Sequence, residues 1–324
     1  MLEPLKFKPI LKEIIWGGEE ICRFKGIESV KNGIGESWEL SGVKNNVSVV
    51  SEGRFAGKSL DELLSQYGEK LLGKRVFEKF GTDFPLLIKF IDARTPLSIQ
   101  VHPNDELAKK RHNSAGKTEM WYVVKAAPGA YLYSGFAKQI TPEQYVESLG
   151  TGDFINYLQR YEVSGGDVFF LPAGRVHAIG SGCFIAEIQQ TSDITYRIYD
   201  YNRKDADGKP RELHTALAKD AIDYAVYPDY RVNYKVHGEE TELVSCPYFT
   251  TELIKIEENT TFIPQNAADS FRIFIGLAGK ARIFSPEKYR TNINAGETVL
   301  LPAECGLPQI FAENSAKLLQ VYIK

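Results

Sequence analysis

Residues 166–173 read GDVFFLPA and residues 296–303 read GETVLLPA, so a glycine turn, a short apolar strand and a Pro-Ala turn occur twice. The preceding segments, 120–125 and 271–277, are also alike, because both are aromatic and β-branched and both lead into a glycine turn. A repeat of this kind predicts two related β-barrels in one chain. The alternative is a chance match of a short turn–strand–turn signature.

The regions around the repeat are mainly β as well. Short apolar runs bounded by turn residues predict strands at 86–91, 97–101, 119–125, 130–133, 168–171 and 184–189. Helix signals predict three inserted helical segments, at 59–80, from 141 to about 160, and at 213–224. We therefore expect a catalytic β-barrel unit at 1–230 and a smaller, degenerate one at 231–324, against which the N-terminal strands can pack.

The composition excludes several classes of protein. The 324 residues carry 39 Lys and Arg against 42 Asp and Glu, a net charge of −3, without the basic excess of a nucleic-acid binder. No apolar run reaches the roughly 18 residues of a spanning helix, and the N-terminus has no secretory signal pattern. The four cysteines are scattered without a C-x-x-C pair, as expected of free thiols. We expect a cytoplasmic protein that binds neither nucleic acid nor membrane.

Four polar side chains on short apolar segments point to one metal ion. Gln100 and His102 lie two residues apart, so on a strand they share a face while Ile99 faces the opposite side. Glu119 begins the next strand-like run, and His177 ends the turn after another. Two imidazoles, a carboxylate and an amide oxygen suit Zn²⁺ with positions left for water or substrate, and also Mn²⁺, Fe²⁺ or Co²⁺. Taken singly, each histidine is more often a hydrogen-bonded core or surface residue.

The second copy of the repeat lacks this chemistry. The position eleven residues after Gly166 is His177, whereas the position eleven after Gly296 is Leu307, and no histidine follows His237. The first copy is therefore expected to carry the metal and the second to be structural.

These motifs resemble those of the type I mannose-6-phosphate isomerases, also called phosphomannose isomerases, in their short bacterial form. The segment Gly166, Pro172, Gly174 and His177 resembles the second motif of the wider cupin superfamily. The likeness to the isomerases covers most of the chain and is carried by residues 16–18, 35–39, 98–105, 116–121 and 177–197. It implies two cupin-like jelly-roll barrels and one Zn²⁺ per chain. It also implies a sugar-phosphate substrate and interconversion of mannose 6-phosphate and fructose 6-phosphate through a cis-enediol.

The resemblance also assigns roles to individual residues. It places the zinc ligands on Gln100, His102, Glu119 and His177. The active-site arginine falls on Arg197, Ser98 and Lys117 fall on pocket residues, and Glu187 falls on a carboxylate proposed for acid–base roles. One departure is Arg203, which stands where some longer members have a pocket lysine, and an arginine does not lose its proton readily. The chain is also too short for the helical insertion of the eukaryotic members.

Several alternatives stay open from sequence alone. Glu187 is the first candidate for the base, because a carboxylate is a poor structural choice on the apolar strand 184–188. It can instead form a structural ion pair with Arg197 or Lys117, and Lys117 is the second candidate base. Arg197 and Lys117 are candidate phosphate and oxyanion contacts. The competing functions are a non-catalytic sugar-binding bicupin and another cupin metalloenzyme, and we expect a monomer or a weak homodimer.

Overall fold

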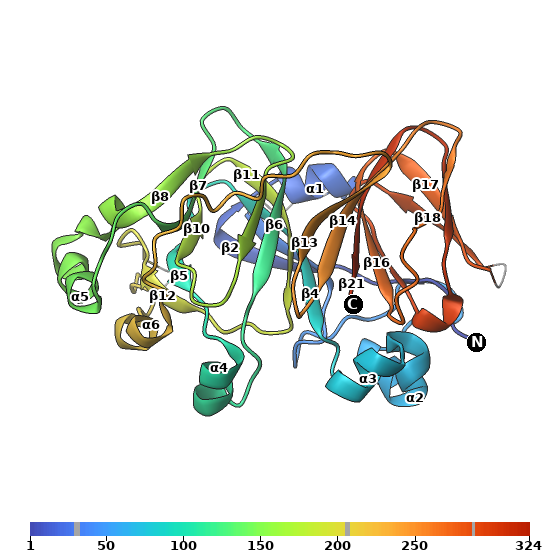
Figure 1. Ribbon diagram of the computed structural model, residues 1–324, viewed down its shortest axis with the longest axis horizontal. Helices are drawn as coiled ribbons and strands as arrows, with labels where there is room; N and C mark the ends of the chain where they lie inside the picture. Colours follow the sequence, from blue (N-terminus) through green and yellow to red (C-terminus); the bar gives the residue numbers. More distant parts are fainter. Residues whose placement is uncertain (29–32, 205–207, 287–288) are drawn as a thin grey trace.

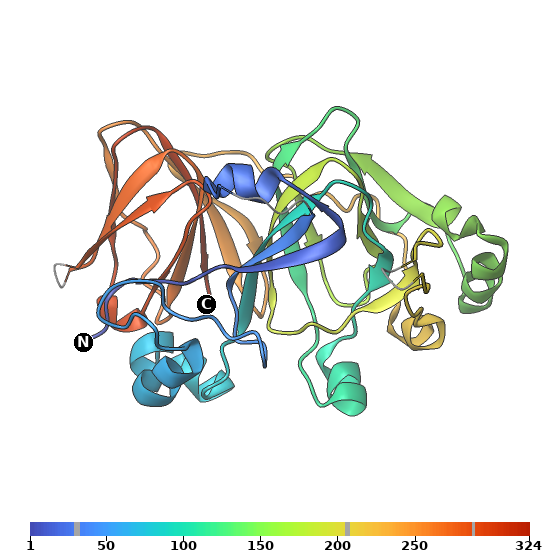
Figure 2. The same cartoon turned by 180° about the vertical axis from the view of Figure 1, so that it is seen from behind.

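The computed structural model describes residues 1–28, 33–204, 208–286 and 289–324. In this part of the chain the strands form four sheets, arranged as two side-by-side halves that each contain two facing sheets (Figures 1 and 2). The fold is therefore mainly β, as predicted. Within the described residues no sheet closes on itself, so the expected closed barrels are not found.

The first half consists of a six-stranded and a five-stranded sheet. In sheet order, the six-stranded sheet contains β2 (Ile10–Gly18), β3 (Ile34–Leu40), β4 (Leu86–Ala93), β11 (Cys183–Gln190), β6 (Glu119–Ala126) and β9 (Val168–Leu171). The five-stranded sheet contains β12 (Tyr196–Tyr199), β5 (Ile99–Val101), β10 (His177–Ile179), β7 (Tyr131–Phe136) and β8 (Leu158–Glu162). Apolar side chains from both sheets, including Trp121, Leu132 and Ile185, form one core between them.

The second half repeats this arrangement with fewer strands. Its larger sheet contains β1 (Leu5–Lys6), β19 (Thr298–Leu301), β16 (Arg272–Ala278), β21 (Ala316–Tyr322), β14 (Thr250–Ile256) and β13 (Glu240–Ser245). The smaller sheet contains β15 (Thr261–Phe262), β20 (Gln309–Ala312), β17 (Lys280–Phe284) and β18 (Arg290–Asn294). Because β1 comes from the N-terminus and pairs Leu5 with Leu300, the first residues of the chain belong to the second half.

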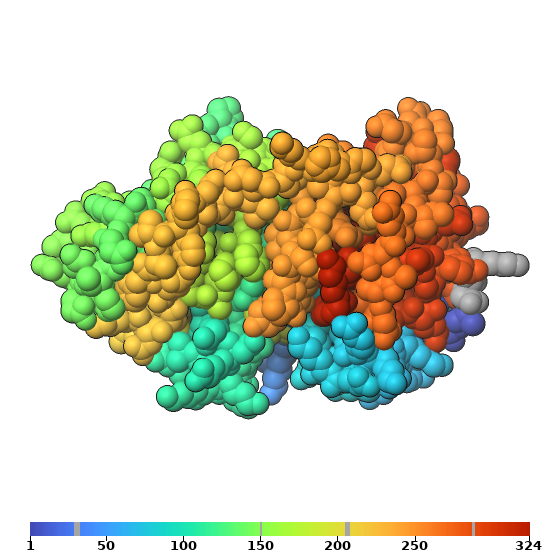
Figure 3. All heavy atoms as spheres, viewed as in Figure 1, coloured from blue at the N-terminus to red at the C-terminus, as the bar shows by residue number. Residues whose placement is uncertain are grey.

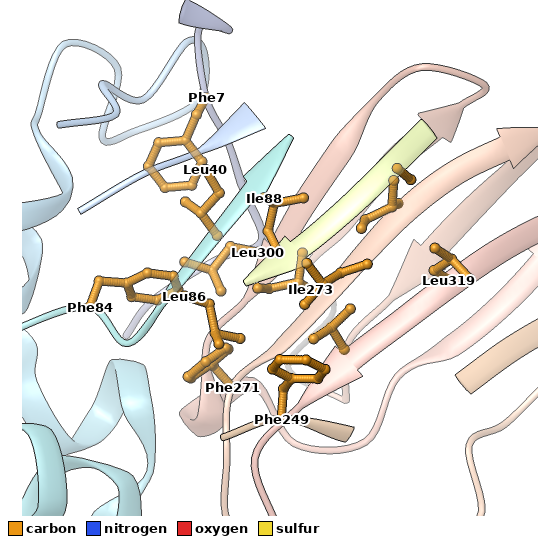
Figure 4. Packing of buried hydrophobic residues seen from close by; sticks show 14 of the residues in the cluster. Phe7, Leu40, Phe84, Leu86, Ile88, Phe249, Phe271, Ile273, Leu300 and Leu319 are labelled. Atoms are coloured by element: carbon orange, nitrogen blue, oxygen red, sulfur yellow. The ribbon is translucent and has the colours of Figure 1, made fainter. Parts of the chain in front are cut away.

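The two six-stranded sheets pack face to face, and their contact is the largest apolar cluster. Leu86 and Ile88 of β4 belong to this cluster together with Ile273, Leu300 and Leu319 of the second half, and Leu300 and Ile273 lie beside them in Figure 4. Strand β4 is buried along its whole length because its sheet is covered on both faces, by the second half on one side and by the five-stranded sheet on the other.

Helices cover the outside. They are α1 (Glu20–Lys25), α2 (Leu60–Leu72), α3 (Lys74–Phe80), α4 (Asp105–His112), α5 (Pro142–Thr151) and α6 (Thr215–Ala221), with 3₁₀ turns η1 (Asp153–Tyr157) and η2 (Ala303–Cys305). Helices α5 and α6 contribute to an apolar cluster with the five-stranded sheet. Helix α4 lies at the lower edge in Figure 1 and connects β5 to β6, two of the three strands on or beside which the candidate ligands lie.

The helix predictions were right in position but wrong in length. Residues 59–80 form two helices, because Gly73 adopts a φ of +90°, which L-residues rarely take. A capping box begins the first helix, with Ser59 Oγ accepting from the Glu62 N–H at 3.2 Å and the Glu62 carboxylate accepting from the Ser59 N–H at 2.8 Å. In the segment predicted from 141 to about 160, α5 ends at Thr151 and η1 continues the helical stretch from Asp153 to Tyr157.

Helix α4 was not predicted. Its sequence, DELAKKRH, has no apolar stripe, so the hydrophobic periodicity gave no helix signal. Its termini are nonetheless well capped. The Asn104 side chain accepts a hydrogen bond from the Leu107 N–H at 2.9 Å, and Asn113 ends the helix in the left-handed region at a φ of +51°.

Candidate active site

Strand pairing brings the predicted ligands together. Strand β5 lies between β10 and β12, so Gln100 is directly opposite His177 on one side. His102 immediately follows β5, and Glu119 begins β6 in the facing sheet. His102, Glu119 and His177 offer ligand atoms that all lie within 4.8 Å of one another. Glu119 Oε1 lies 3.3 Å from His177 Nε2, and Glu119 Oε2 lies 3.6 Å from His102 Nε2.

Backbone carbonyls orient both imidazole rings. His102 Nδ1 lies 3.0 Å from the Ile194 carbonyl oxygen, and His177 Nδ1 lies 2.9 Å from the Arg175 carbonyl oxygen. Because a carbonyl can only accept a hydrogen bond, each Nδ1 carries the proton. Each Nε2 then carries a lone pair on the side of the ring that faces Glu119. This is the arrangement in which histidines ligate metals, with the second ring nitrogen held by a hydrogen bond.

Burial sets the electrostatics of this cluster. It lowers the pKa of His177 to about 3 and the pKa of His102 well below its usual value, so both rings are neutral. Burial also raises the pKa of Glu119 to about 7, against the attraction of Lys117. Glu119 is fully buried, yet its Oε1 accepts no hydrogen bond from the described residues. A buried carboxylate oxygen without a partner, beside two neutral imidazole lone pairs, fits a divalent cation.

Gln100 and Lys117 complete the surroundings of the cluster. Gln100 Nε2 lies 3.2 Å from His177 Nε2, and a turn of the amide would present its oxygen at the same place. Lys117 Nζ lies 3.0 Å from Glu119 Oε2 and 3.1 Å from His102 Nε2. In the protein without a bound metal, the Lys117 ammonium therefore balances the negative charge of Glu119.

A cavity of about 320 Å³ opens beside this cluster. It is lined by the other residues singled out in the sequence, namely Ser98, Gln100, Lys117, Glu187 and Arg197. The structure thus collects these residues, which span almost a hundred positions of the chain, around one space. A larger surface cavity of about 610 Å³ lies between α3, α4 and the loop carrying Tyr248, and contains none of them.

Glu187 is paired, but not with the partners expected. Its Oε1 lies 3.2 Å from Lys89 Nζ, and Trp121 Nε1 donates to its Oε2 at 2.9 Å. Burial raises the pKa of this carboxyl, but attraction to Lys89 and Lys117 outweighs that effect, so the pKa is lowered. Glu187 is therefore an ionised carboxylate at neutral pH. The described residues show no ion pair between Glu187 and Arg197.

Arg197 belongs to a group of arginines around Asp200. Its Nη1 donates to the Glu212 carbonyl oxygen at 2.9 Å, while its Nε is buried without a hydrogen-bond partner among the described residues. Arg211, which also lines the cavity, donates from Nε to Asp200 Oδ2 at 2.7 Å. Burial lowers the pKa of Arg197, and repulsion from Arg211 and Arg203 adds to the effect.

Arg203 does not line the cavity. It forms an ion pair with Asp200 and hydrogen-bonds the Pro96 carbonyl oxygen, so its guanidinium points toward structural partners. The sequence left the role of Arg203 open, and the structure shows its contacts. Arg203 forms an ion pair with Asp200, and Asp200 also accepts a hydrogen bond from Arg211.

The family of the chain follows from comparison with known proteins. Residues 5–122 match the model of the phosphomannose isomerase type I catalytic domain. Mannose-6-phosphate isomerase ManA of Bacillus subtilis is 37% identical over 94% of each chain, and the mannose-6-phosphate isomerase of Streptococcus mutans is 35% identical over 93% of each. The chain belongs to the type I phosphomannose isomerase family.

Solved structures of this family share the whole fold. The crystal structure of the Bacillus subtilis mannose 6-phosphate isomerase superposes with a TM-score of 0.88 at 29% identity, covering 99% of this chain and all of the other. The apo enzyme of Salmonella typhimurium has a TM-score of 0.79 at 16% identity over the full length of both chains. At that identity the second comparison shows the fold alone. None of the described helices is long and apolar enough to cross a membrane.

Two residues of this phosphomannose isomerase family member were missed in the sequence. Lys89 lies inside the apolar run 86–91, so the reasoning that singled out Glu187 on its apolar strand would also have found it. Arg211 lies outside the named strands, in the polar segment 208–212. A charged residue is ordinary in such a segment, so the sequence gave no reason to single it out.

Proposed function

We propose that the protein interconverts mannose 6-phosphate and fructose 6-phosphate by a metal-dependent proton transfer. The observation that carries the proposal is the buried cluster of His102, Glu119 and His177, which opens onto a cavity holding an ionised carboxylate and arginines. The family to which the chain belongs supports the same reaction.

We assign the ion to Zn²⁺, one per chain, held by Gln100, His102, Glu119 and His177. The bound ion would supply positive charge near the C1 and C2 oxygens of the opened sugar, where negative charge develops. The two neutral imidazoles and the partnerless Oε1 of Glu119 support this ligand set. The set is also open to other divalent metals.

Glu187 is the proposed base. The C2 proton of the opened mannose 6-phosphate passes to the Glu187 carboxylate and leaves a cis-enediolate, which becomes the cis-enediol when O1 takes up a proton. The enediol then gives up its O2 proton, and Glu187 returns its proton to C1, which gives fructose 6-phosphate. The lowered pKa of Glu187 keeps it ionised and ready to accept the proton. Trp121 and Lys89 hold its two oxygens in place. Lys117 is the second candidate for proton transfer, since it also lines the cavity.

The phosphate is proposed to bind at the arginine group. Arg197, Arg203 and Arg211 carry three positive charges, and the nearby carboxylates Asp200 and Glu212 carry two negative ones, which leaves a net charge of +1. A sugar phosphate carries about −1.5 to −2 at neutral pH, so the two charges are opposite in sign. Arg197 and Arg211 reach the cavity and would make the direct contacts, with Ser98 on the same wall.

The two halves are proposed to be cupin-like jelly rolls, with the catalytic unit at 1–230 and the degenerate one at 231–324. The repeat supports this proposal, because β9 and β19 occupy matching places in their sheets. Glu119 pairs with Leu171 across β6 and β9, and Arg272 pairs with Leu301 across β16 and β19. Leu171 and Leu301 are the same position of the repeat, so Arg272 stands where Glu119 stands.

A cation therefore replaces a carboxylate ligand in the second half. In the same way, the cross-strand pair of Lys89 and Glu187 corresponds to Glu252 and Gln320, which hydrogen-bond directly at 2.7 Å. These exchanges support a purely structural role for the second half. We also propose that the protein is cytoplasmic and works as a monomer or weak homodimer.

The test is turnover of mannose 6-phosphate by protein with and without metal. Dialysis against a chelator should abolish isomerase activity, and added Zn²⁺ should restore it. A metal-binding bicupin without a catalytic role would bind Zn²⁺ but never convert the sugar, and an oxygenase of the same fold would require iron and consume oxygen. Full activity in metal-free protein would exclude the proposed role of the metal.

A further inference from the structure

The turn before His177 is the only support of its Nδ1 proton among the described residues. Arg175 supplies the accepting carbonyl oxygen, 2.9 Å from Nδ1. The turn itself is fixed at Gly174, whose N–H donates to the His102 carbonyl oxygen at 2.9 Å and whose carbonyl oxygen accepts from the Asp223 N–H at 2.9 Å. The orientation of the His177 ring therefore depends on how firmly the backbone at Arg175 is held.

The side chain of Arg175 is held by two aromatic rings. Its guanidinium carbon lies 5.0 Å from the ring centre of Tyr227 and 4.4 Å from that of Tyr230, and the residue is 9% exposed. The guanidinium makes no ion pair or hydrogen bond with the described residues. Cation–π contact with this tyrosine clamp, Tyr227 and Tyr230, therefore holds the side chain, and attraction to the nearby Asp223 carboxylate adds to it.

The clamp belongs to the segment that links the two halves. After α6 this linker, residues 222–239, runs across the surface from the first half to the second (gold to orange in Figure 3). Tyr230 anchors it, because its hydroxyl donates to the Phe136 carbonyl oxygen at 3.0 Å and accepts from the N–H groups of Phe136 and Tyr227 at 3.1 Å. Phe136 ends β7, the neighbour of β10, which His177 begins.

We propose that Arg175 is a positioning residue, and that its stacking in the tyrosine clamp sets the orientation of His177 and hence the affinity for the metal. This inference rests on the proposed metal-dependent function and assigns the linker a role in it. The clamp fixes the guanidinium, the guanidinium fixes the backbone of residue 175, and the carbonyl there fixes the imidazole. Loss of outer contacts of this kind typically lowers metal affinity by about 10–100-fold.

Variants of Arg175 and Tyr227 separate the contribution of guanidinium stacking from those of the charge and the size of the Arg175 side chain. Arg175→Met keeps the stem but removes the planar group, and Arg175→Lys keeps the charge but cannot stack as a plane between two rings. Tyr227→Leu removes one ring at a position that is 43% exposed, so folding should be unaffected. Arg160→Met is the matched control, since Arg160 also stacks on a tyrosine, 4.3 Å from the ring centre of Tyr131, but its carbonyl does not support a ligand.

The experiment measures the affinity of metal-free protein for Zn²⁺ by competition with a chromogenic chelator, and the visible spectrum after Co²⁺ loading. We expect Arg175→Met and Arg175→Lys to bind Zn²⁺ about 10–100-fold more weakly than the parent and the Arg160→Met control, with Tyr227→Leu in between. The Co²⁺ spectra of the two Arg175 variants should shift relative to that of the parent. The melting temperature of their metal-free forms should match that of the metal-free control, and excess Zn²⁺ should restore their turnover.

Two results would overturn the inference. One is unchanged Zn²⁺ affinity and Co²⁺ spectrum in both Arg175 variants and in Tyr227→Leu, whatever their activity. The other is a lower melting temperature of the metal-free Arg175 variants with unchanged affinity, which would show a structural role alone. Failure of the proposed function has a different signature, because the parent protein itself would then bind no Zn²⁺ or convert no mannose 6-phosphate.

Discussion

Lys89 offers the sharpest test of how the site is built. Its side chain is buried on a strand that is buried throughout, and its Nζ lies 3.2 Å from Glu187 Oε1 and 3.9 Å from Glu36 Oε2. Replacement with methionine in Lys89→Met keeps the length and volume of the side chain and removes only the charge. Glu187 would then remain as a buried carboxylate without its nearest cation.

The magnitude follows from the distance and the burial. Two unit charges 3.2 Å apart attract by about 5 kcal/mol at an effective dielectric constant of about 20. Part of that attraction offsets the loss of hydration of the two ions, so breaking a buried pair by removing one partner destabilises a protein by about 3–5 kcal/mol. We expect a loss of this size in the free energy of unfolding of Lys89→Met.

Urea unfolding at pH 7.5 measures this loss against two controls. Lys125→Met removes a lysine whose ion pair with Glu20 is 2.6 Å long but largely exposed, so it should lower stability by less than about 1 kcal/mol. The double variant Lys89→Met/Glu187→Gln removes both buried charges and should recover most of the loss. If Lys89→Met is no less stable than Lys125→Met, the buried pair does not stabilise Glu187 as argued.

The loss should also depend on pH. In the parent protein the pKa of Glu187 is lowered from its usual 4.5, so its contribution to stability is present above that value and is lost as pH falls through the folded pKa. In Lys89→Met burial acts with less opposition and raises this pKa, so the destabilisation grows as pH rises above about 4.5. The difference between parent and variant should therefore be smaller at pH 5 than at pH 8, and a constant difference would contradict the assignment.

Three further predictions address the metal and the arginines. His177→Ala should bind less than stoichiometric Zn²⁺ by metal analysis, and full occupancy would remove His177 from the ligand set. Arg211→Met should raise KM for mannose 6-phosphate about 10–100-fold, because it removes one hydrogen bond to a charged group. Arg203→Met should mainly lower the melting temperature, because Arg203 does not line the cavity. Equal effects of the two variants on KM would place both arginines in the cavity. The metal-free parent should lose stability as pH falls from about 6.5 toward 4.5, because the unfolded chain takes up protons that the buried His102 and His177 do not bind. Glu119, whose pKa is raised to about 7, acts in the opposite direction, but it is one group against two. Urea unfolding at pH 7.5 and 5 measures this, and equal stability would refute it.

The candidate metal cluster could be found from sequence because its information is local. The alternation of a single strand places Gln100 and His102 on one face, and glycine turns mark where the neighbouring strands begin. The structure brings His102, Glu119 and His177 together as these patterns indicated. The repeat likewise marked matching strands, β9 and β19, in the two halves.

The partners of the candidate base could not be found in the same way. Lys89 meets Glu187 only because β4 and β11 pair in one register, with these two residues directly opposite each other. A shift of one residue would turn Lys89 to the face that packs against the second half. Periodicity determines which face a residue occupies but not which strand lies beside it, so the expected partners, Arg197 and Lys117, were reasonable but not the ones found.

One carboxylate, Asp200, links an arginine outside the cavity to one that lines it. The Arg203 guanidinium binds the Pro96 carbonyl oxygen and Asp200, away from the cavity. Asp200 then holds Arg211, whose side chain reaches the cavity instead. Asp200 thus positions the positive charge of Arg211 at the cavity. Because Asp200 is 5% exposed and bonded to both arginines, Asp200→Asn should disturb Arg211 and Arg203 together, and the KM for the sugar phosphate should rise although Asp200 itself does not line the cavity.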